Sequence, residues 1–284
     1  MTIKTAIIGL GIMGRRMLEH MHRHPGFAPD YIWDPDPAAC AQAQDMVPGA
    51  QVMKSAEAAM DAADMVYLAC PPVPRKTYAL YAADAGKGVF LEKPLGVDVD
   101  ASTDLVERLR ASGVPAAVNF VQAAGAALEG VVTARDDGSM GDLRGADIVV
   151  TYAHWPRAWQ QAADWLRFRE EGGATREVIS HFLFFAERVL GPLTVVWSHP
   201  TYPADAALCE THLAARLETQ AGEPVSILLS IGGAQPDRQE LTIKGQNASH
   251  RIAEFFRHAV SDGGAYVPQA EDPADPRVGK RTIL

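Results

Sequence analysis

Three glycines near the start of the chain have the spacing needed to hold a phosphate group. Gly9, Gly11 and Gly14 form a GxGxxG pattern after an apolar run and before a helical pattern. The first glycine permits a tight turn, the second lets the backbone approach a pyrophosphate, and the third lets helix and strand pack closely. We therefore predict a dinucleotide site at Gly9, Gly11, Ile12, Met13 and Gly14, with the helix N-terminus facing the phosphates. The alternative is a glycine-rich turn without a ligand.

An acidic residue lies where it would distinguish NAD from NADP. Asp34 follows the second apolar run, 20 residues after Gly14, where a carboxylate can accept a hydrogen bond from the ribose 2′-hydroxyl. It would repel a 2′-phosphate, and no Arg or Lys lies within Pro35–Asp36–Pro37 to neutralise that charge. The prediction is NAD, with NADP less favoured. Two alternatives stay open: Asp36 as the ribose ligand, and Asp34 as a simple turn cap.

A second group of polar residues offers acid–base chemistry. Glu92 and Lys93 directly follow an apolar run, at the sheet edge where open α/β folds bind ligands. Glu177 and His181 are four residues apart and would share one face of a helix. The carboxylate could then orient the imidazole, which exchanges protons near neutral pH. Each residue also has a structural alternative: Lys93 as a solvated loop residue, and Glu177 with His181 as a surface pair.

Short apolar runs alternate with helical patterns over residues 1–119, and these elements would position the groups above. Met13, Met17 and Met21 recur at helical spacing, and residues 98–111 suit a surface helix. The alternation is typical of a doubly wound parallel sheet with crossover helices. We predict a Rossmann domain over residues 1–119, with strands at residues 5–8, 31–33, 65–69, 88–91 and 116–119.

From about residue 143 the pattern changes to longer strands joined by short Gly/Pro turns. The expected strands are residues 147–152, 193–198, 211–219, 225–231 and 240–243, and a helix-rich insert lies at 157–190. This pattern predicts a C-terminal α+β domain, residues 120–284, with a mainly antiparallel open sheet. It would bind the substrate and form a homodimer or homotetramer through that sheet. Residues 271–284 are polar and Pro-rich, and we expect a surface extension there.

Composition excludes several classes of partner. The chain has 284 residues, 48% of them hydrophobic, and a net charge of −9, which opposes nucleic-acid binding and favours a small-molecule ligand. The three cysteines form no CxxC pair and there is no HExxH, so we expect no metal site, no disulfide framework and a reducing, cytoplasmic compartment. Glycines interrupt the apolar run at residues 6–13, which favours a buried strand over a signal sequence, and no run suits a membrane span.

The order and spacing of five motifs resemble the glucose–fructose oxidoreductase, inositol dehydrogenase and rhizopine-catabolism oxidoreductase family. The motifs are GLGIMG at residues 9–14, DPDP at 34–37, the prolines at 71–72, GKGVFLEKPLG at 86–96 and GGATREVISH at 172–181. The resemblance implies that Lys93, Glu177 and His181 flank a substrate beside the nicotinamide. It implies hydride transfer between NAD and a hydroxyl-bearing carbon of a small sugar, polyol or related metabolite. Further cofactor contacts are expected at Cys70, Pro71, Glu92 and Lys93.

The sequence departs from the family pattern around the expected substrate. Glu177 stands where Asp is usual, Ile179 where Gly is frequent and Phe184 where many members have another Asp. Pro72, Arg75 and Gln122 replace an Asn, a His and an Arg. Indole and guanidinium groups near residue 160 could clamp a carboxylate or a sugar face. The candidate substrate residues are Asn119, Gln122, Trp155, Trp165, Arg167 and Arg176.

Three other functions stay open at this point. Arginines near the site would suit a carboxylate, so the chain could reduce an imine or a keto acid. NAD could instead be used transiently in an isomerase, lyase or hydrolase reaction without net redox change. The third possibility is a regulator that binds NAD without catalysis.

Overall fold

The computed structural model describes residues 2–160 and 163–270, and the chain divides into two compact units, Met1–Asn119 and Phe120–Leu284. The extension predicted over residues 271–284 lies outside the described residues. Within the described part of the chain, no helix is long and apolar enough to cross a membrane.

The N-terminal unit is built on a parallel sheet with the strand order β3-β2-β1-β4-β5-β6. Its strands are β1 (Ile3–Ile8), β2 (Phe27–Trp33), β3 (Gln51–Val52), β4 (Met65–Leu68), β5 (Gly88–Leu91) and β6 (Ala116–Val118). Its helices are α1 (Ile12–Arg23), α2 (Pro37–Met46), α3 (Ala56–Ala62), α4 (Pro72–Asp84) and α5 (Val99–Ser112).

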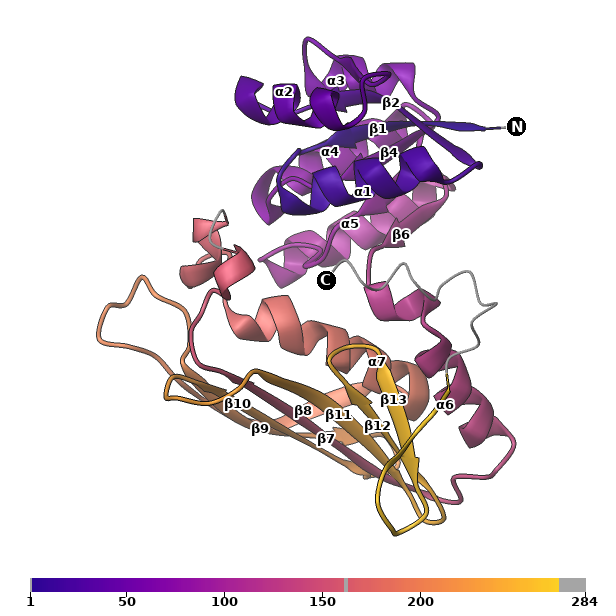
Figure 1. Ribbon diagram of the computed structural model, residues 1–284, viewed down its shortest axis with the longest axis vertical. Helices are drawn as coiled ribbons and strands as arrows, with labels where there is room; N and C mark the ends of the chain where they lie inside the picture. The colour runs from indigo at the N-terminus through magenta and orange to yellow at the C-terminus, as the bar shows by residue number, and fades with distance from the viewer. Residues whose placement is uncertain (1, 161–162, 271–284) are drawn as a thin grey trace. The chain divides into compact units, whose positions relative to one another are not determined.

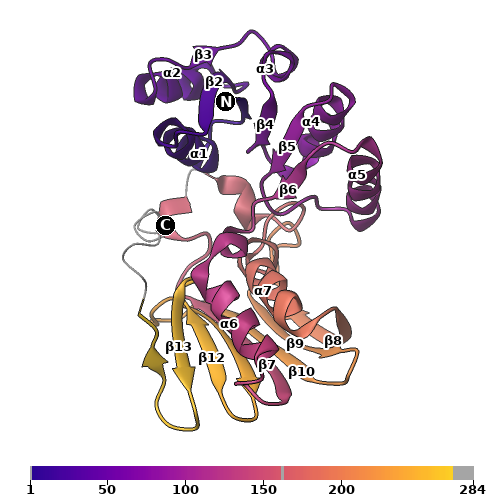
Figure 2. The same cartoon turned by 90° about the vertical axis from the view of Figure 1, so that its right-hand side faces the viewer.

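Helices cover both faces of this sheet (Figure 2). Successive strand residues face opposite sides, so Ile7 and Tyr67 pack against α1 and α2, whereas Ile8 and Leu68 pack with α3, α4 and α5. The predicted doubly wound class is confirmed. The connections also bring the carboxyl ends of β1, β4 and β5 to one edge, where the predicted cofactor residues lie.

The C-terminal unit contains an eight-stranded sheet with the order β14-β13-β12-β11-β7-β10-β9-β8. Only β7 and β10 pair in parallel within the described residues, so the predicted mainly antiparallel sheet is confirmed. The strands are β7 (Leu143–Tyr152), β8 (Leu193–Thr201), β9 (His212–Thr219), β10 (Pro224–Ile231), β11 (Arg238–Gly245), β12 (Ser249–Ala253), β13 (Arg257–Ser261) and β14 (Val267–Pro268).

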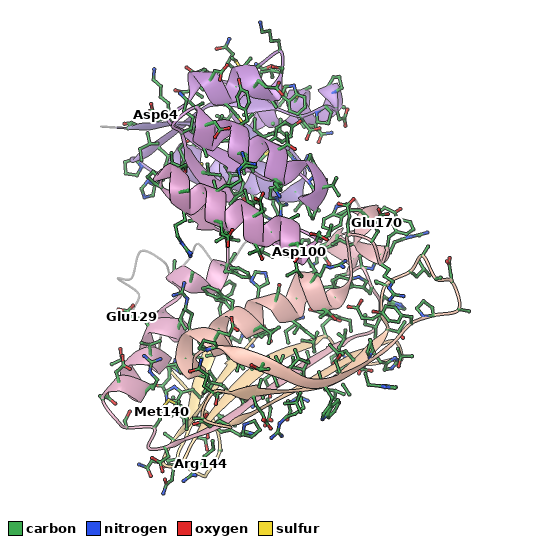
Figure 3. The ribbon with its side chains drawn as sticks, turned by 180° about the vertical axis from the view of Figure 1, so that it is seen from behind. Asp64, Asp100, Glu129, Met140, Arg144 and Glu170 are labelled. Atoms are coloured by element: carbon green, nitrogen blue, oxygen red, sulfur yellow. The ribbon has the colours of Figure 1, made fainter. Side chains whose placement is uncertain are left out.

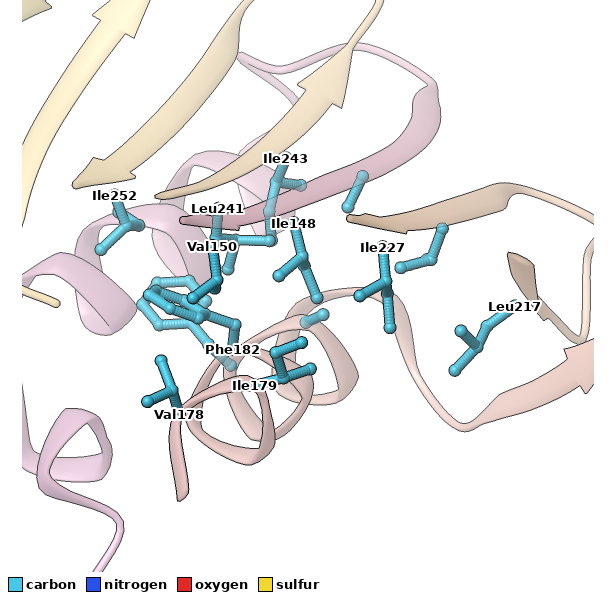
Figure 4. Packing of buried hydrophobic residues seen from close by; sticks show 14 of the residues in the cluster. Ile148, Val150, Val178, Ile179, Phe182, Leu217, Ile227, Leu241, Ile243 and Ile252 are labelled. Carbon is cyan, nitrogen blue, oxygen red and sulfur yellow. The ribbon is translucent and has the colours of Figure 1, made fainter. Parts of the chain in front are cut away.

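Helices α6 (Ala126–Asp136) and α7 (Ser180–Leu190) lie against one face of this sheet (Figure 1). Alternate residues of β7 and β11, such as Ile148, Val150 and Leu241, are fully buried there and meet Phe182 and Ile179 (Figure 4). This packing orients α7 and the residues that precede it.

A hydrogen bond also connects the start of β7 to the residue that follows the end of β11. Arg144, which lies near the start of β7 and close to Met140 (Figure 3), donates from Nη2 to Gln246 Oε1 at 2.9 Å. Gln246 directly follows β11. The contact therefore supports the antiparallel register of β7 and β11.

Several elements differ from the expectation. Strands β3, β12, β13 and β14 were not predicted. Among the described residues of the insert at 157–190, which omit 161 and 162, α7 is the only α-helix. The other helical segments are two 3₁₀ turns, η2 (Ala158–Gln160) and η3 (Asp164–Arg167), and a π-turn, η4 (Thr175–Ile179). The 3₁₀ helix η1 (Val121–Ala124) precedes α6.

Candidate functional site

The glycine-rich turn between β1 and α1 is shaped for a close ligand. Gly9 has a φ of +93°, and a Cβ there would lie 2.6 Å from the backbone nitrogen of Cys70, so only glycine fits. At Gly11 a Cβ would meet no atom within 4 Å, which leaves that side of the turn open. No side chain caps the N-terminus of α1. An open backbone with uncapped N–H groups fits a pyrophosphate.

Asp34 lies directly against this turn. The backbone N–H of Leu10 donates to Asp34 Oδ2 at 2.6 Å, and the N–H of Asp36 donates to Asp34 Oδ1 at 2.9 Å. Asp36 itself accepts from the N–H of Ala38 at 2.9 Å and caps α2. Asp36 thus has a structural task, and Asp34 is the carboxylate that the fold holds beside the phosphate-binding turn.

A buried hydrogen-bond network joins the ends of β4, β5 and β6. The Glu92 carboxylate accepts from the Tyr67 hydroxyl, from Asn119 Nδ2 at 2.7 Å and from the backbone N–H of Lys93 at 3.2 Å. Burial, followed by the charge of Glu92, raises the pKa of Tyr67 well above its ordinary value. Glu92 and Asn119, predicted as a cofactor and a substrate residue, therefore bond to each other and brace the loop that carries Lys93.

Arg75 ties this loop to its neighbour. Its buried guanidinium donates to the carbonyl of Cys70 after β4 and to the carbonyl of Pro94 after β5. Burial lowers the pKa of Arg75. The predicted residues Cys70, Pro71 and Lys93 thus lie on two loops that Arg75 connects through its hydrogen bonds. The peptide bond between Lys93 and Pro94 is cis.

In the C-terminal unit, His181 lies between two aromatic rings. The imidazole, in α7, is 5% exposed. Phe120 and Phe255 each contact it edge to face, with ring centroids at 5.7 and 5.4 Å. Phe184, which stands where an acidic residue was common in the family pattern, stacks on Phe120 at 4.5 Å. The imidazole therefore has apolar walls on two sides.

Phe255 belongs to a strained turn between β12 and β13. Phe255 and Glu254 have φ values of 66° and 49°, a left-handed conformation that is uncommon for residues other than glycine. Gln122, predicted as a substrate residue, donates from Nε2 to the Phe255 carbonyl at 3.0 Å, and Phe182 stacks on the Phe255 ring. Gln122 thus holds the turn that presents Phe255 to His181. Sequence reasoning missed Phe255 because it missed the hairpin.

Glu177 lies in the π-turn η4, which runs directly into α7. Such turns are rare and occur frequently at functional sites. Before it, Gly173 has a φ of +104°, and a Cβ there would lie 2.7 Å from Glu210 Oε2. Glu210 Oε1 accepts from the Thr175 N–H at 2.7 Å and from the Thr175 hydroxyl at 2.6 Å. Glu210, a buried residue without any sequence signal, therefore caps the segment that carries Glu177.

Two further residues reach Glu177 through hydrogen bonds. Gln160 donates from Nε2 to Glu177 Oε1 at 3.3 Å, and Gln160 Oε1 accepts from Arg157 Nε at 2.9 Å. Gln160 was not among the predicted site residues, because a lone glutamine in a loop gives no pattern to detect.

The other predicted substrate residues mainly stabilise the insert itself. Arg176 donates from Nη1 to the carbonyls of Arg169, Glu170 and Gly172. Trp155 donates from Nε1 to the Leu166 carbonyl at 3.0 Å. Arg167 is exposed and lies 3.5 Å from Asp164, and Trp165 is half-buried in η3. These contacts lie within the insert, and the clamp for a carboxylate or a sugar face stays a prediction.

Each unit thus brings together a part of the predicted site. The N-terminal unit unites the glycine-rich turn with Asp34, and the loops after β4 and β5 with Lys93. The C-terminal unit places Glu177 in the π-turn η4 and His181 in the first turn of α7. Among the described residues there is no cluster of three or more His, Cys, Asp or Glu side chains that could hold a metal ion.

Comparison with known proteins agrees with the fold and the glycine-rich turn. Residues 3–120 match the model of the GFO_IDH_MocA family, described as an oxidoreductase family with an NAD-binding Rossmann fold. An uncharacterised oxidoreductase from Streptococcus pneumoniae is 27% identical over 180 residues, which cover 60% of this chain and 46% of that protein. An inositol 2-dehydrogenase from Corynebacterium glutamicum is 32% identical over 109 residues, or 37% of this chain and 32% of that protein. The matches thus span less than half of these curated relatives.

A similar fold has also been solved. The crystal structure of the WlbA dehydrogenase from Bordetella pertussis, in complex with NADH and UDP-GlcNAcA, superposes with a TM-score of 0.81. The superposition covers 98% of this chain and 80% of that one, at 23% identity. This likeness shows a shared fold.

Proposed function

We propose that the chain is an NAD-dependent oxidoreductase, because residues 3–120 match the model of an oxidoreductase family with an NAD-binding Rossmann fold. It would transfer a hydride between the nicotinamide and a hydroxyl-bearing carbon of a small sugar, polyol or related metabolite. The inositol 2-dehydrogenase among the relatives supports the polyol class.

The contact between Asp34 and the glycine-rich turn carries the proposal. Because Leu10 N–H already holds one oxygen of Asp34 beside the open side of Gly11, a ribose hydroxyl and a pyrophosphate would find adjacent partners there. Gly9, Gly11, Ile12, Met13 and Gly14 would hold the pyrophosphate, and Cys70, Pro71 and Lys93 would face the nicotinamide end. The Asp34 carboxylate favours NAD over NADP, because it would repel a 2′-phosphate.

The proposed chemistry assigns one task to each polar side chain. When bound, NAD supplies the hydride acceptor or donor. In the oxidative direction His181 accepts the proton of the substrate hydroxyl, and Lys93 donates a hydrogen bond to that oxygen as the carbonyl forms. Glu177 orients the imidazole or binds a neighbouring hydroxyl. Phe120 and Phe255 limit access of water to the imidazole.

The proposed organisation assigns cofactor binding to residues 1–119, and substrate binding and self-association to residues 120–284. A second copy would dock on the sheet face that α6 and α7 leave open, forming a homodimer or homotetramer. The three free, buried cysteines support the predicted reducing, cytoplasmic compartment.

A substrate screen with matched variants tests the proposal. Polyols, sugars, lactones, hydroxy acids and imines are assayed for the change in NADH absorbance, with NADP run in parallel. We expect NAD-dependent turnover of a polyol or sugar. His181→Ala should lower that turnover by about 10²–10⁴-fold, the usual share of a general base, and leave NAD affinity unchanged. The exposed His22, changed to Ala, is the control.

Other outcomes of the screen point to the other functions. Unchanged turnover in His181→Ala would remove His181 from the mechanism. Product without net NADH would indicate transient use of NAD, and NAD binding without any turnover would indicate a regulator. Reduction of a keto acid or an imine has less support, because Arg157 and Arg176 are engaged within the insert.

A further inference from the structure

We propose that Arg157 and Gln160 form a positioning relay that fixes the direction of the Glu177 carboxylate. This inference rests on the proposed function, in which Glu177 lies beside the reacting imidazole. Neither Arg157 nor Gln160 needs to touch the substrate, so both are positioning residues.

The first step is the orientation of the Gln160 amide. A guanidinium is only a hydrogen-bond donor, so the Gln160 oxygen must face Arg157 Nε, 2.9 Å away. The Gln160 NH₂ group must then point the other way, toward Glu177 Oε1 at 3.3 Å. Arg157 thereby determines that the amide nitrogen of Gln160, and not its oxygen, faces Glu177. Gln160 is 2% exposed, so water does not compete readily for either contact.

The second step is the fixation of Arg157 itself. Its guanidinium carbon lies over the rings of Tyr152 at 5.4 Å, Trp155 at 5.9 Å and Trp159 at 4.7 Å. Cation–π contacts of this kind hold a guanidinium without an ion pair. Trp155 is in turn anchored to the Leu166 carbonyl. The positive charge therefore acts on Glu177 through a neutral amide, and contacts with three aromatic rings hold the guanidinium in place.

The third step concerns the length of the Glu177 side chain. Glutamate has one more rotatable bond than the aspartate of the family pattern, so its carboxylate has more directions available. The hydrogen bond from Gln160 to Oε1 removes much of that freedom. The relay thus compensates for the longer side chain, and it sets the position at which a substrate hydroxyl or the imidazole would meet the carboxylate.

A swap of donor and acceptor tests the contact itself. Gln160→Glu keeps an oxygen toward Arg157 but places a carboxylate against Glu177, so Tm should fall further than in Gln160→Leu. Adding Glu177→Gln restores a donor opposite an acceptor, and Tm should recover in the double variant. Recovery of Tm without recovery of turnover is expected, since the double variant lacks the Glu177 carboxylate. A double variant no more stable than Gln160→Glu would overturn the relay.

Kinetics test the positioning role. Gln160→Leu and Arg157→Met should each lower kcat by about tenfold, typical for residues that orient a functional group, with NAD affinity unchanged. The double variant should lose no more than either single one, because both changes break the same connection. Gln235→Leu is the matched control, since the Gln235 side chain donates to the backbone carbonyls of Gly232 and Tyr152.

The two readouts separate the relay from the proposed function. Additive losses in Arg157→Met and Gln160→Leu, or unchanged kcat in both, would refute the positioning role. If the wild-type chain turns over no substrate, the proposed function fails, yet the Tm pattern of the swap still reports whether Gln160 and Glu177 are bonded.

Discussion

An added methyl group should affect ligand binding at Gly11 but fold stability at Gly14, although both glycines lie in one turn. At Gly14 a Cβ would lie 1.9 Å from the Gly9 carbonyl oxygen, whereas at Gly11 it would meet no atom within 4 Å. Gly14→Ala should therefore destabilise the fold by about 1–3 kcal/mol or more through overpacking. Gly11→Ala should leave stability unchanged and weaken NAD binding by about tenfold or more, near 1.4 kcal/mol, because its methyl group enters the pyrophosphate space.

Thermal unfolding and NAD titration of the two variants check this contrast. Gly49→Ala serves as the control, since Gly49 is also open but lies away from the turn. Equal NAD affinity in wild type and Gly11→Ala would show that the phosphates do not approach Gly11.

Spacing revealed only some of the residues that shape the site. The glycines, Asp34, Glu177 and His181 form short-range patterns, which is why the sequence marks them as candidates. Gln160, Glu210 and Phe255 act through contacts with residues distant in the sequence, so no local pattern marks them. Asn119, Gln122 and Arg176 were predicted as substrate residues, and in the structure each of them forms hydrogen bonds that brace loops.

At the scale of elements, β12 and β13 carry an unusual pair on their buried face. His250 Nδ1 lies 2.8 Å from His258 Nε2, and the two rings stack. On α6, a Cβ at Gly130 would lie 3.5 Å from the His258 ring, in ordinary van der Waals contact, so α6 packs close to this histidine. Burial, followed by the charge of His250, lowers the pKa of His258 to about 4, and burial also lowers the pKa of His250.

This pair predicts a loss of stability in mild acid. A histidine whose pKa falls on folding binds protons more readily in the unfolded chain, so stability is full above about pH 6.5 and declines toward about pH 4. His258→Gln keeps a polar partner for His250 but does not titrate. Its free energy of unfolding should therefore depend less on pH in that window than the wild-type value. Denaturant titrations at several pH values across this range check the prediction. The same dependence of the free energy of unfolding on pH in the variant and the wild type would contradict it.

The same histidines explain why the sequence did not reveal this hairpin. Strands were predicted where apolar residues alternate, as in β7 and β10. In β12 and β13 histidines take inward positions and arginines precede or interrupt the apolar residues, so the alternation is lost. The insert before α7 was expected to be helix-rich, but two glycines and the Glu210 cap set a π-turn that periodicity does not detect.

At the scale of the whole molecule, the open face of the second sheet is the proposed site of self-association. Leu217 on β9 faces the core, so its neighbour Arg216 faces the opposite side of the sheet. Trp197 on β8 pairs with Arg216 and therefore lies on that side, opposite the helices. Trp197 is 52% exposed, and Leu228 on β10 is exposed as well. Large exposed apolar groups on an open sheet are typical of an interface.

Trp197→Glu should raise the dimer dissociation constant by at least about 30-fold, as expected for an interface tryptophan worth about 2 kcal/mol. Sedimentation analysis over a range of concentrations measures the effect. Val267→Glu, at the exposed edge strand β14, is the control because β14 and β8 are opposite edges of the sheet. A wild-type chain that stays monomeric, or a variant that associates equally well, would refute this interface.

The number of residues in η4 matters as much as their chemistry. A π-turn contains one residue more than an α-turn, and each residue of an α-helix advances about 100° around the axis. Removing Val178 or Ile179, which lie between Glu177 and His181, would therefore swing Glu177 around the helix relative to His181, although the acid and the base would both be kept. The number of residues in η4 therefore sets the angle between the acid and the base around the helix axis. Related chains should be compared first by the number of residues in this segment and then by residue type.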